Sequence, residues 1–474
     1  MVNKKLLYYF YFSIVVILSI SGNTFGQLPN FNMHLLANVN PHPGTGSPST
    51  YSALWGYTAS NGREYVILGC QSGTSFIDIT DSSNMHEAAF LPGLNSNWRE
   101  EKVIGHYAYI VSEAAGSGMQ IVDLQYLPDS VHFVKNANFP NHSKTHTIQS
   151  YGRYLFLNGC NAEFIAGQGT VIIDCLDPVN PVVRGKASST IGGNTNGYIH
   201  DCRIVNDTLY ACNIYQGYVT AYDIRNKDSI KAFKSWQTNP NPLTHNCAFT
   251  TNRKYIFTTD ETNSPNGKLK IWNVQDIMNP VFVTSWQPTD ITTAIVHNVE
   301  VYGNYALVAH YTAGVRLLDI SVPETPVEIA YYDTDPATNA SLFNGCWAVY
   351  MFPSKKIAAS DMATGLYVVK TNSTITNIGY NELNNIPTEY SLKQNFPNPF
   401  NPTTVIEFSI PENSNVKLKI FNSLGKEISE LVNDRRDRGT YRVEFDGTRL
   451  ASGIYFYSLI TNDHSETRKM ILIK

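Results

Sequence analysis

The sequence predicts an all-β protein: a seven-bladed β-propeller followed by a small Ig-like β-sandwich. Two patterns support this fold class. A similar strand ending recurs about every fifty residues along most of the chain. Each recurring unit contains four short apolar or alternating stretches, which is the strand number of a propeller blade. The composition agrees, because 43% of the residues are hydrophobic, 12% are aromatic and only 16% are charged.

Residues 1–26 are predicted to be a secretory signal peptide. The basic start "MVNKK" precedes an apolar run over 6–20, and small residues at Thr24 and Gly26 suit cleavage after Gly26. An uncleaved membrane anchor is the alternative, but this run is short for a hydrocarbon core of ~30 Å. No later run is long enough to span a bilayer, so we expect an exported chain without a transmembrane segment. The net charge of -4 gives no reason to expect nucleic acid as a partner.

The seven cysteines contain no CxxC pair, and their odd number leaves at least one thiol free if the others pair within the chain. Cys202 and Cys212 could face each other across a hairpin, although the geometry of a cross-strand disulfide is demanding. We expect most of the cysteines to be buried, unpaired thiols.

Residues 27–371 form the predicted propeller. Six of its units share a strand that ends in an acidic or amide residue, as in "SFIDIT" over 75–80 and "VRLLDIS" over 315–321, and the seventh keeps the strand but has Val369 at that position. A solenoid would need shorter repeats and end caps, and neither is visible. We expect the recurring carboxylates to accept hydrogen bonds from N–H groups of the following turn. Successive marker residues are 45 to 51 positions apart, and they are Asp78, Asp123, Asp174, Asp223, Asn273, Asp319 and Val369.

The two ends of the repeat region predict how the ring of blades closes. The seventh unit ends at Lys370 without a fourth strand, and a spare strand-like stretch, "NMHLLANV" over 32–39, precedes the first unit. Pairing of this stretch with the seventh unit would complete the blade and leave no open sheet edge. We therefore expect an N-terminal strand to close the last blade.

The turns and unit starts carry a resemblance to known families. Turns of the type "DPVNP" (177–181) and "PETP" (323–326) follow the recurring strands, and two units begin with tryptophan, in "LWGYT" (54–58) and "NWREEKV" (97–103). The strand and turn pattern resembles the LVIVD-repeat family, and the tryptophan-initiated units resemble the secreted propellers called choice-of-anchor B. The resemblance covers residues 31–371. It implies export and attachment to the cell surface, and it implies no established reaction.

The C-terminal region is predicted to be a linker followed by a sorting domain. Residues 372–388 are polar and rich in Asn and Thr, and residues 389–474 carry alternating stretches typical of a β-sandwich. "QNFPNPFNPTT", "FNSLGKEI", "LASGIYFYSLI" and "KMILIK" closely resemble the type A C-terminal sorting domain of the type IX (Por) secretion system. This implies the type IX secretion machinery as a partner and a location at the cell surface or outside the cell. An ordinary Ig-like adhesion domain is the alternative. The proposed sorting-signal residues are Asn398, Pro399, Gly425, Gly453, Lys469 and Lys474.

Two positions in each unit are expected at the same mouth of the propeller channel: the start of the first strand and the end of the second. Four of the seven first-strand starts are histidines, and the full set is Trp55, Trp98, His146, His200, His245, His297 and Trp347. The second-strand ends are mostly polar, and Gly-rich loops follow them, which is typical of binding surfaces on a rigid scaffold. The predicted ligand-binding residues at this mouth are Glu113, Asn161, Asn213, Asp260, His310 and Asp361.

The histidines admit two interpretations. Each imidazole could hydrogen-bond to the backbone or to the neighbouring blade, which would be a structural role. Alternatively, imidazole and carboxylate groups from neighbouring blades could converge on a divalent metal such as Zn²⁺, Fe²⁺ or Mn²⁺. The candidate ligands for such a metal are His200, His245, His297, His310, Asp260 and Asp361. Among these, His310 occupies a position that varies between units, so it is the histidine for which we expect a functional role.

The chain contains no GxSxG, HExxH, P-loop or GxGxxG motif. This favours an exported binding module, not an enzyme, that recognises a glycan, a peptide or a protein at the histidine-rich mouth. The alternative is a metal-dependent hydrolase or lyase with its site at the same mouth. A scaffold within a cell-surface complex is a third alternative.

Overall fold

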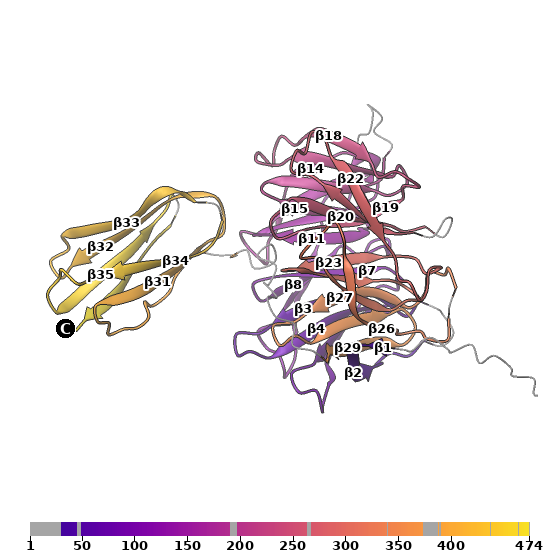
Figure 1. The fold of residues 1–474 in the computed structure, drawn as a ribbon, viewed down its shortest axis with the longest axis horizontal. Helices are drawn as coiled ribbons and strands as arrows, with labels where there is room; N and C mark the ends of the chain where they lie inside the picture. Colours follow the sequence, from indigo (N-terminus) through magenta and orange to yellow (C-terminus); the bar gives the residue numbers. More distant parts are fainter. Residues whose placement is uncertain are drawn as a thin grey trace, which may run out of the picture.

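The computed structural model describes two regions of β-structure, one over residues 30–372 and one over residues 390–473 (Figure 1). The predicted signal peptide (1–26), most of the linker (372–388) and Lys474 lie outside the described residues. Within the described part of the chain, no helix is long and apolar enough to cross a membrane. The described residues are 30–44, 49–189, 197–262, 267–338, 340–372, 387, 390–436, 438–462 and 464–473.

Each of the first six repeat units forms an antiparallel sheet whose strands pair in chain order. The first three sheets contain β3 (Tyr51–Thr58), β4 (Glu64–Cys70), β5 (Gly73–Asp78) and β6 (His86–Pro92); β7 (Arg99–Ile104), β8 (Tyr107–Ser112), β9 (Met119–Asp123) and β10 (His132–Ala137); and β11 (Thr147–Tyr151), β12 (Tyr154–Asn158), β13 (Thr170–Asp174) and β14 (Val182–Ala187). A short 3-10 turn, η1 (Ala166–Gln168), precedes β13.

The next three sheets repeat this arrangement. They contain β15 (Asp201–Val205), β16 (Thr208–Asn213), β17 (Tyr218–Asp223) and β18 (Lys231–Gln237); β19 (Thr244–Phe249), β20 (Tyr255–Asp260), β21 (Leu269–Asn273) and β22 (Val281–Trp286); and β23 (Asn298–Tyr302), β24 (Tyr305–Ala309), β25 (Val315–Asp319) and β26 (Val327–Tyr332). A two-residue strand, β1 (Asn30–Phe31), pairs with the outer edge of β26, and the sequence analysis did not predict this pairing.

The seventh sheet joins the two ends of the repeat region. It contains β27 (Cys346–Met351), β28 (Ile357–Asp361) and β29 (Gly365–Thr371), and its outer strand is β2 (Met33–Val39). Leu35 of β2 lies opposite Val369 of β29. The predicted closure of the last blade by an N-terminal strand is therefore confirmed. The outer strands of all seven sheets also share an irregularity in their pairing with the third strand, and β2 has it between Leu35 and Ala37.

The first strands of successive sheets form a closed ring. They contact one another in the order β3, β7, β11, β15, β19, β23 and β27, and β27 contacts β3 again. Because each sheet packs against a neighbour on both faces, a strand such as β4 is buried along its whole length, whereas the outer strand β18 is largely exposed. This is the arrangement of a β-propeller, and the predicted fold class is confirmed.

The recurring carboxylates act in turns, as predicted. In six units the side-chain oxygen of the marker residue accepts a hydrogen bond from the backbone N–H two residues later, at 2.8 to 3.0 Å. The cysteine prediction is also confirmed, because all seven thiols are free and buried. Because these thiols are buried, the geometry supports no redox role for them.

The C-terminal region is a two-sheet sandwich. One sheet contains β30 (Ser391–Leu392), β31 (Thr403–Ile410) and β34 (Gly439–Asp446), and the other contains β33 (Glu427–Arg436), β32 (Ser414–Asn422), β35 (Gly453–Ile460) and β36 (Ser465–Leu472). Among the sorting-signal residues, Asn398 accepts a hydrogen bond from the N–H of Ile471 at 2.9 Å. Gly425 lies in a turn with a φ of 77°, which favours glycine. Gly453 begins β35, and Lys469 lies in β36.

Candidate functional site

Four imidazoles lie side by side at one mouth of the propeller channel. We call His146, His200, His245 and His297 the histidine row. Their ring centroids are 4.2, 4.1 and 4.3 Å apart in that order. The spacing follows from the fold, because each histidine stands at or next to the start of the first strand in one of four consecutive sheets. A cavity of about 30 Å³ is lined by all four and by the indoles of Trp98 and Trp347.

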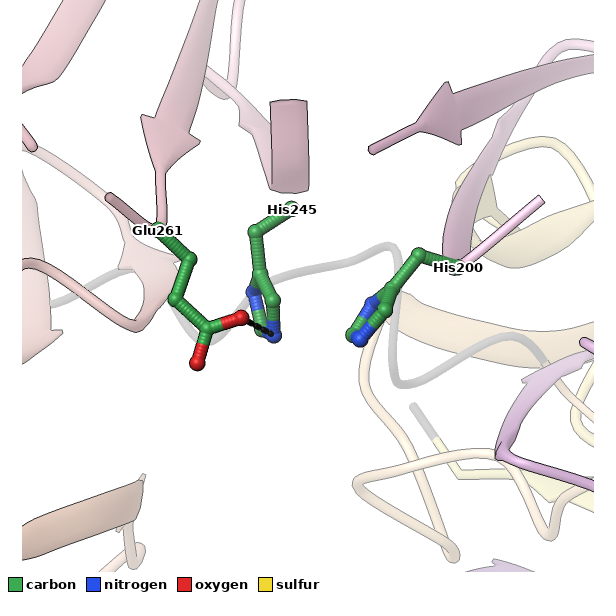
Figure 2. A group of neighbouring side chains, drawn as sticks. All are labelled: His200, His245 and Glu261. Carbon is green, nitrogen blue, oxygen red and sulfur yellow. Dashed lines mark ion pairs between the residues drawn. The ribbon is translucent and has the colours of Figure 1, made fainter. Parts of the chain in front are cut away.

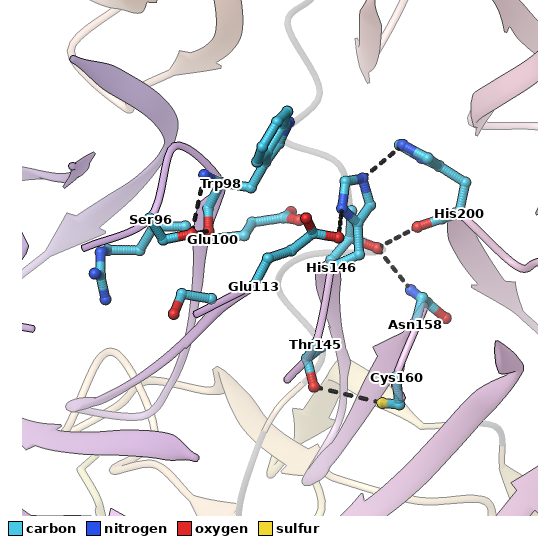
Figure 3. Close-up of polar contacts among 12 residues, drawn as sticks. Ser96, Trp98, Glu100, Glu113, Thr145, His146, Asn158, Cys160 and His200 are labelled. Atoms are coloured by element: carbon cyan, nitrogen blue, oxygen red, sulfur yellow. Dashed lines mark hydrogen bonds and ion pairs between the residues drawn. The ribbon is translucent and has the colours of Figure 1, made fainter. Parts of the chain in front are cut away.

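The His146 end of the row is fixed by a carboxylate (Figure 3). Nδ1 of His146 lies 2.9 Å from Oε1 of Glu113 and donates its proton there, because a carboxylate only accepts. Nε2 of His146 lies 2.6 Å from Nε2 of His200, so one proton is shared between the two rings. Burial alone raises the pKa of Glu113, but its contacts with His146 outweigh burial and hold that pKa below its usual value. Glu113 was predicted to line this mouth, and it reaches the row.

A second carboxylate lies at the other end of the row (Figure 2). Oε2 of Glu261 is 3.5 Å from Nε2 of His245, and Oε1 is 3.8 Å from Nε2 of His297. The hydroxyl of Tyr311 donates to Oε1 of Glu261 at 2.5 Å and so fixes the orientation of the carboxylate. Burial raises the pKa of Glu261 to about 7. One imidazole nitrogen each of His200 and His245 and one oxygen of Glu261 lie within 4.8 Å of one another.

Three imidazoles of the row, those of His200, His245 and His297, are held in their neutral form. Burial, with a smaller contribution from neighbouring imidazoles, places the pKa values of His200 and His245 well below the ordinary value. Burial lowers the pKa of His297 to about 3. Nδ1 of His297 donates to the backbone carbonyl of Trp347 at 2.5 Å, so a neutral ring leaves its Nε2 as a bare lone pair facing Glu261. Neutral imidazoles with free lone pairs can ligate metal.

Two nitrogens in the row lack a hydrogen-bond partner among the described residues. They are Nδ1 of His200 and Nδ1 of His245, and both are buried. The backbone of His245 nevertheless acts on the ring of His200, and the backbone of His297 acts on the ring of His245. The structural interpretation, in which each histidine bonds to the backbone or the next blade, therefore fits His297, the His146–His200 pair and, through a weaker contact, His245.

The structure does not bring the other predicted metal ligands into the row. Asp260 forms a 2.6 Å ion pair with Lys270 and accepts a hydrogen bond from the N–H of Leu243. Asp361 accepts hydrogen bonds from the N–H groups of Ala363 and Thr364. Both carboxylates are therefore engaged in local structure, and neither belongs to the cluster of potential metal ligands found among the described residues.

The two predicted asparagines have local partners as well. Asn161 accepts a hydrogen bond from the N–H of Ser143 at 2.8 Å, which holds the preceding loop. Asn213 donates to Ser189 at 2.7 Å and accepts from Thr220 at 3.0 Å. Neither side chain lines the small cavity at the histidine row.

His310 lies apart from the row. Its side chain is fully buried, and neither ring nitrogen has a hydrogen-bond partner in the described part of the chain. The nearest aromatic contact is the indole of Trp286, with ring centroids 6.0 Å apart. Burial, together with the nearby charge of Arg316, lowers the pKa of His310 to about 3. The residue that reaches the row from this strand end is the next one, Tyr311, whose ring centroid is 4.7 Å from that of His297.

Three exposed aromatic side chains lie around the row. We call Trp98, Tyr215 and Phe343 the aromatic rim. They are 41%, 71% and 47% exposed. Trp98 lines the same cavity as the row. Tyr215 packs on Tyr198, which contacts two row histidines. Phe343 packs on Tyr311. The rim is therefore continuous with the walls of the row.

Glu261 and Tyr311 were not predicted to belong to the site, although each directly follows a residue that was. The pairing of β19 with β20 is irregular between Thr244 and Asn246, at His245 itself. Such a bulge changes which residue of the partner strand faces a given side. Including the residue that follows each second-strand end among the candidates would have found both side chains.

Comparison with known families and structures bears on the fold and on export. Residues 394–474 match the family described as the secretion system C-terminal sorting domain, and residues 295–334 match the LVIVD repeat. The predicted repeat type and sorting domain are therefore confirmed, and the sorting domain indicates export to the cell surface or the extracellular space. The resemblance to choice-of-anchor B proteins stays a prediction. A comparison with curated proteins gives no match.

Several solved structures are similar at low identity. A putative 6-phosphogluconolactonase from Bacteroides uniformis is 10% identical, with 68% of this chain and 92% of that chain covered and a TM-score of 0.45. PorZ, a surface component of the type IX secretion system of Porphyromonas gingivalis, is 12% identical, with 92% and 61% covered and a TM-score of 0.46. The WD40 β-propeller domain of Doa1 is 7% identical, with 73% and 98% covered and a TM-score of 0.49. Likeness at this level carries no argument about function.

Proposed function

Because this chain is an exported β-propeller protein with an LVIVD repeat and a type IX sorting domain, we propose that it is an extracellular binding module. Its ligand site is the channel mouth, where the aromatic rim surrounds the histidine row. The observation that carries the proposal is the exposure of three aromatic side chains around one buried polar cluster, with Tyr215 71% exposed.

The rim has the properties of a recognition surface. Tyr and Trp supply large, rigid contact area at a low cost in conformational entropy, and they are enriched where binding energy is concentrated. Convergent polar groups beneath such a surface give orientation and specificity. The ligand class that fits is a glycan or a protein segment that lies across the mouth, with apolar faces on the rim.

A metal-dependent hydrolase or lyase remains the second candidate function, and the grouping of His200, His245 and Glu261 is the observation that supports it.

The experiment compares rim variants for retention of ligands. The mature chain is screened against an array of bacterial surface glycans and used to capture proteins from culture supernatant. The test variant replaces Trp98, Tyr215 and Phe343 by alanine. The control is Phe133→Ala, because Phe133 is 40% exposed but lies on the outer strand β10. We expect the control to retain every ligand of the native chain and the rim variant to lose them. Retention of all ligands by the rim variant would contradict the proposal.

A further inference from the structure

We infer that the floor of the channel mouth is a binding site for one divalent first-row transition-metal ion, held by His200, His245 and Glu261 and supported by His297. This inference rests on the buried row and not on the aromatic rim, so it can fail while the proposed function stands, and the reverse also holds.

The candidate ligand atoms converge on one space. The three candidate ligand atoms lie within 4.8 Å of one another, and the Nε2 of His245 is already 3.5 Å from Oε2 of Glu261. Around a tetrahedral Zn²⁺ with bonds of ~2.0–2.1 Å, neighbouring ligand atoms lie roughly 3.4 Å apart. The His245–Glu261 separation already has this value. The remaining separations, up to 4.8 Å, close if the His200 ring, which Figure 2 shows facing the same space, moves away from its 2.6 Å contact with His146.

The lone pairs around the proposed ion also support the site. The proton of His297 is committed to the carbonyl of Trp347, so its Nε2 presents a lone pair toward Oε1 of Glu261, 3.8 Å away. Tyr311 supplies one hydrogen bond to that carboxylate, and its second oxygen faces Nε2 of His245. The Nε2 lone pair of His297 and a carboxylate oxygen of Glu261 therefore face one another in a buried space. A cation among them removes the repulsion and satisfies them together.

Hydrogen bonds from neighbouring residues orient the side chains of the proposed site. Ligating histidines in metal sites usually donate their other N–H to a carbonyl or a carboxylate, and ligating carboxylates are themselves hydrogen-bonded. His297 donates to the carbonyl of Trp347, and Glu261 accepts from Tyr311. The carboxylate ligand therefore has its support in place, and the neighbouring His297 is held in one tautomer.

The identity of the ion follows from the donor set. A donor set of imidazole nitrogens with one carboxylate suits Zn²⁺ and its first-row neighbours, whereas Ca²⁺ and Mg²⁺ prefer oxygen ligands only.

The test titrates the untagged, chelator-treated full chain with Zn²⁺ by calorimetry and with Co²⁺ by visible absorption, using Mg²⁺ as the negative control. We expect one equivalent of Zn²⁺, and a Co²⁺ spectrum of low coordination number. His245→Ala and Glu261→Gln should each weaken binding by ~100-fold or more, beyond the effect typical of outer partners. Glu261→Gln is nearly isosteric, so it separates loss of a ligand from loss of the fold.

The control is His106→Ala, because the His106 side chain is 44% exposed and lies outside the row. It should bind Zn²⁺ as the native chain does. Failure of the native chain to bind either Zn²⁺ or Co²⁺ would overturn the inference. Equal affinity of His245→Ala and His106→Ala would also overturn it, because the ion would then bind elsewhere.

Discussion

The histidine row and His310 are both buried in the same propeller, yet they differ in what surrounds them. The row histidines occupy equivalent places in consecutive sheets, so their ring centroids lie 4.1 to 4.3 Å apart, and carboxylates lie at both ends. His310 has no histidine at the equivalent place in the next sheet, and both of its ring nitrogens are buried without a partner. Recurrence of one residue type at one position is therefore what gathers the side chains into a site.

The proposed metal site departs from the expectation drawn from the sequence. Variation between units selected His310 as the functional histidine, and recurrence suggested a structural role for the others. The site that we propose lies instead at the recurring position, because in a closed ring equivalent positions face one another across a narrow channel. A variable position gains a role only where its side chain reaches that channel, as Glu113 does.

The largest expected difference between the two regions is in stabilisation by zinc. A ligand at a hundred times its Kd stabilises the folded state by about 2.7 kcal/mol. We expect the native chain and His310→Leu to gain this stability on addition of Zn²⁺, and His200→Ala with His245→Ala to gain none. Thermal unfolding with and without Zn²⁺ measures the gain. If Zn²⁺ no longer stabilised His310→Leu, the proposed difference in zinc binding between the row and His310 would be contradicted.

Acid should weaken the native protein, in part through His310. Its pKa is lowered from about 6.5 to about 3 on folding, so the unfolded chain binds more protons between these values. Stability therefore falls as the pH drops from about 6.5 toward 3. In His310→Leu this loss should be smaller. Urea unfolding at pH 7, 5 and 4 gives the two slopes, and identical slopes would mean that His310 titrates normally in the folded state.

Removal of one supporting hydrogen bond should affect the row more mildly. Tyr311→Phe deletes the hydroxyl that orients Glu261. We expect Zn²⁺ affinity to fall on the order of 10-fold, the lower end for an outer partner, with little change in the fold. Tyr302→Phe is the matched control, since Tyr302 is also buried but contacts the N–H of Met351 instead. A larger effect from the Tyr302 change would contradict the supporting role of Tyr311.

The smallest effect is expected for His310→Leu at neutral pH. A buried polar group without a hydrogen bond costs about 1–3 kcal/mol, and leucine of similar size removes that cost. We expect a gain of about 1 kcal/mol in the free energy of unfolding. Equilibrium denaturation in urea measures it. Marked destabilisation would show instead that the imidazole has a partner that stabilises the native state.

The sequence predicted the parts of this architecture that repeat. Four-strand periodicity, the turn carboxylates and the closing strand all follow from local pattern and from the need to leave no sheet edge unpaired. The four row histidines also share one position in the repeat, so their proximity followed from the fold. The prediction could not separate a structural from a ligating role, because that depends on which nitrogen finds a partner.

The parts that escaped prediction depend on local irregularity. The bulge at His245 brings Glu261 to the row in place of Asp260, and a bulge cannot be placed from alternation alone. Asp260 instead pairs with Lys270 on the adjacent strand β21, a contact that strand register decides. The role of Tyr311 likewise depends on its hydrogen bond to a residue 50 positions away.

The most direct test of the central claim is a crystal structure of the zinc-soaked protein with anomalous scattering measured at the zinc absorption edge. The account predicts one strong peak in the channel mouth, ~2.0–2.2 Å from a nitrogen of His200, a nitrogen of His245 and an oxygen of Glu261. No peak at the row, or a stronger peak beside His310, Asp260 or Asp361, would contradict it.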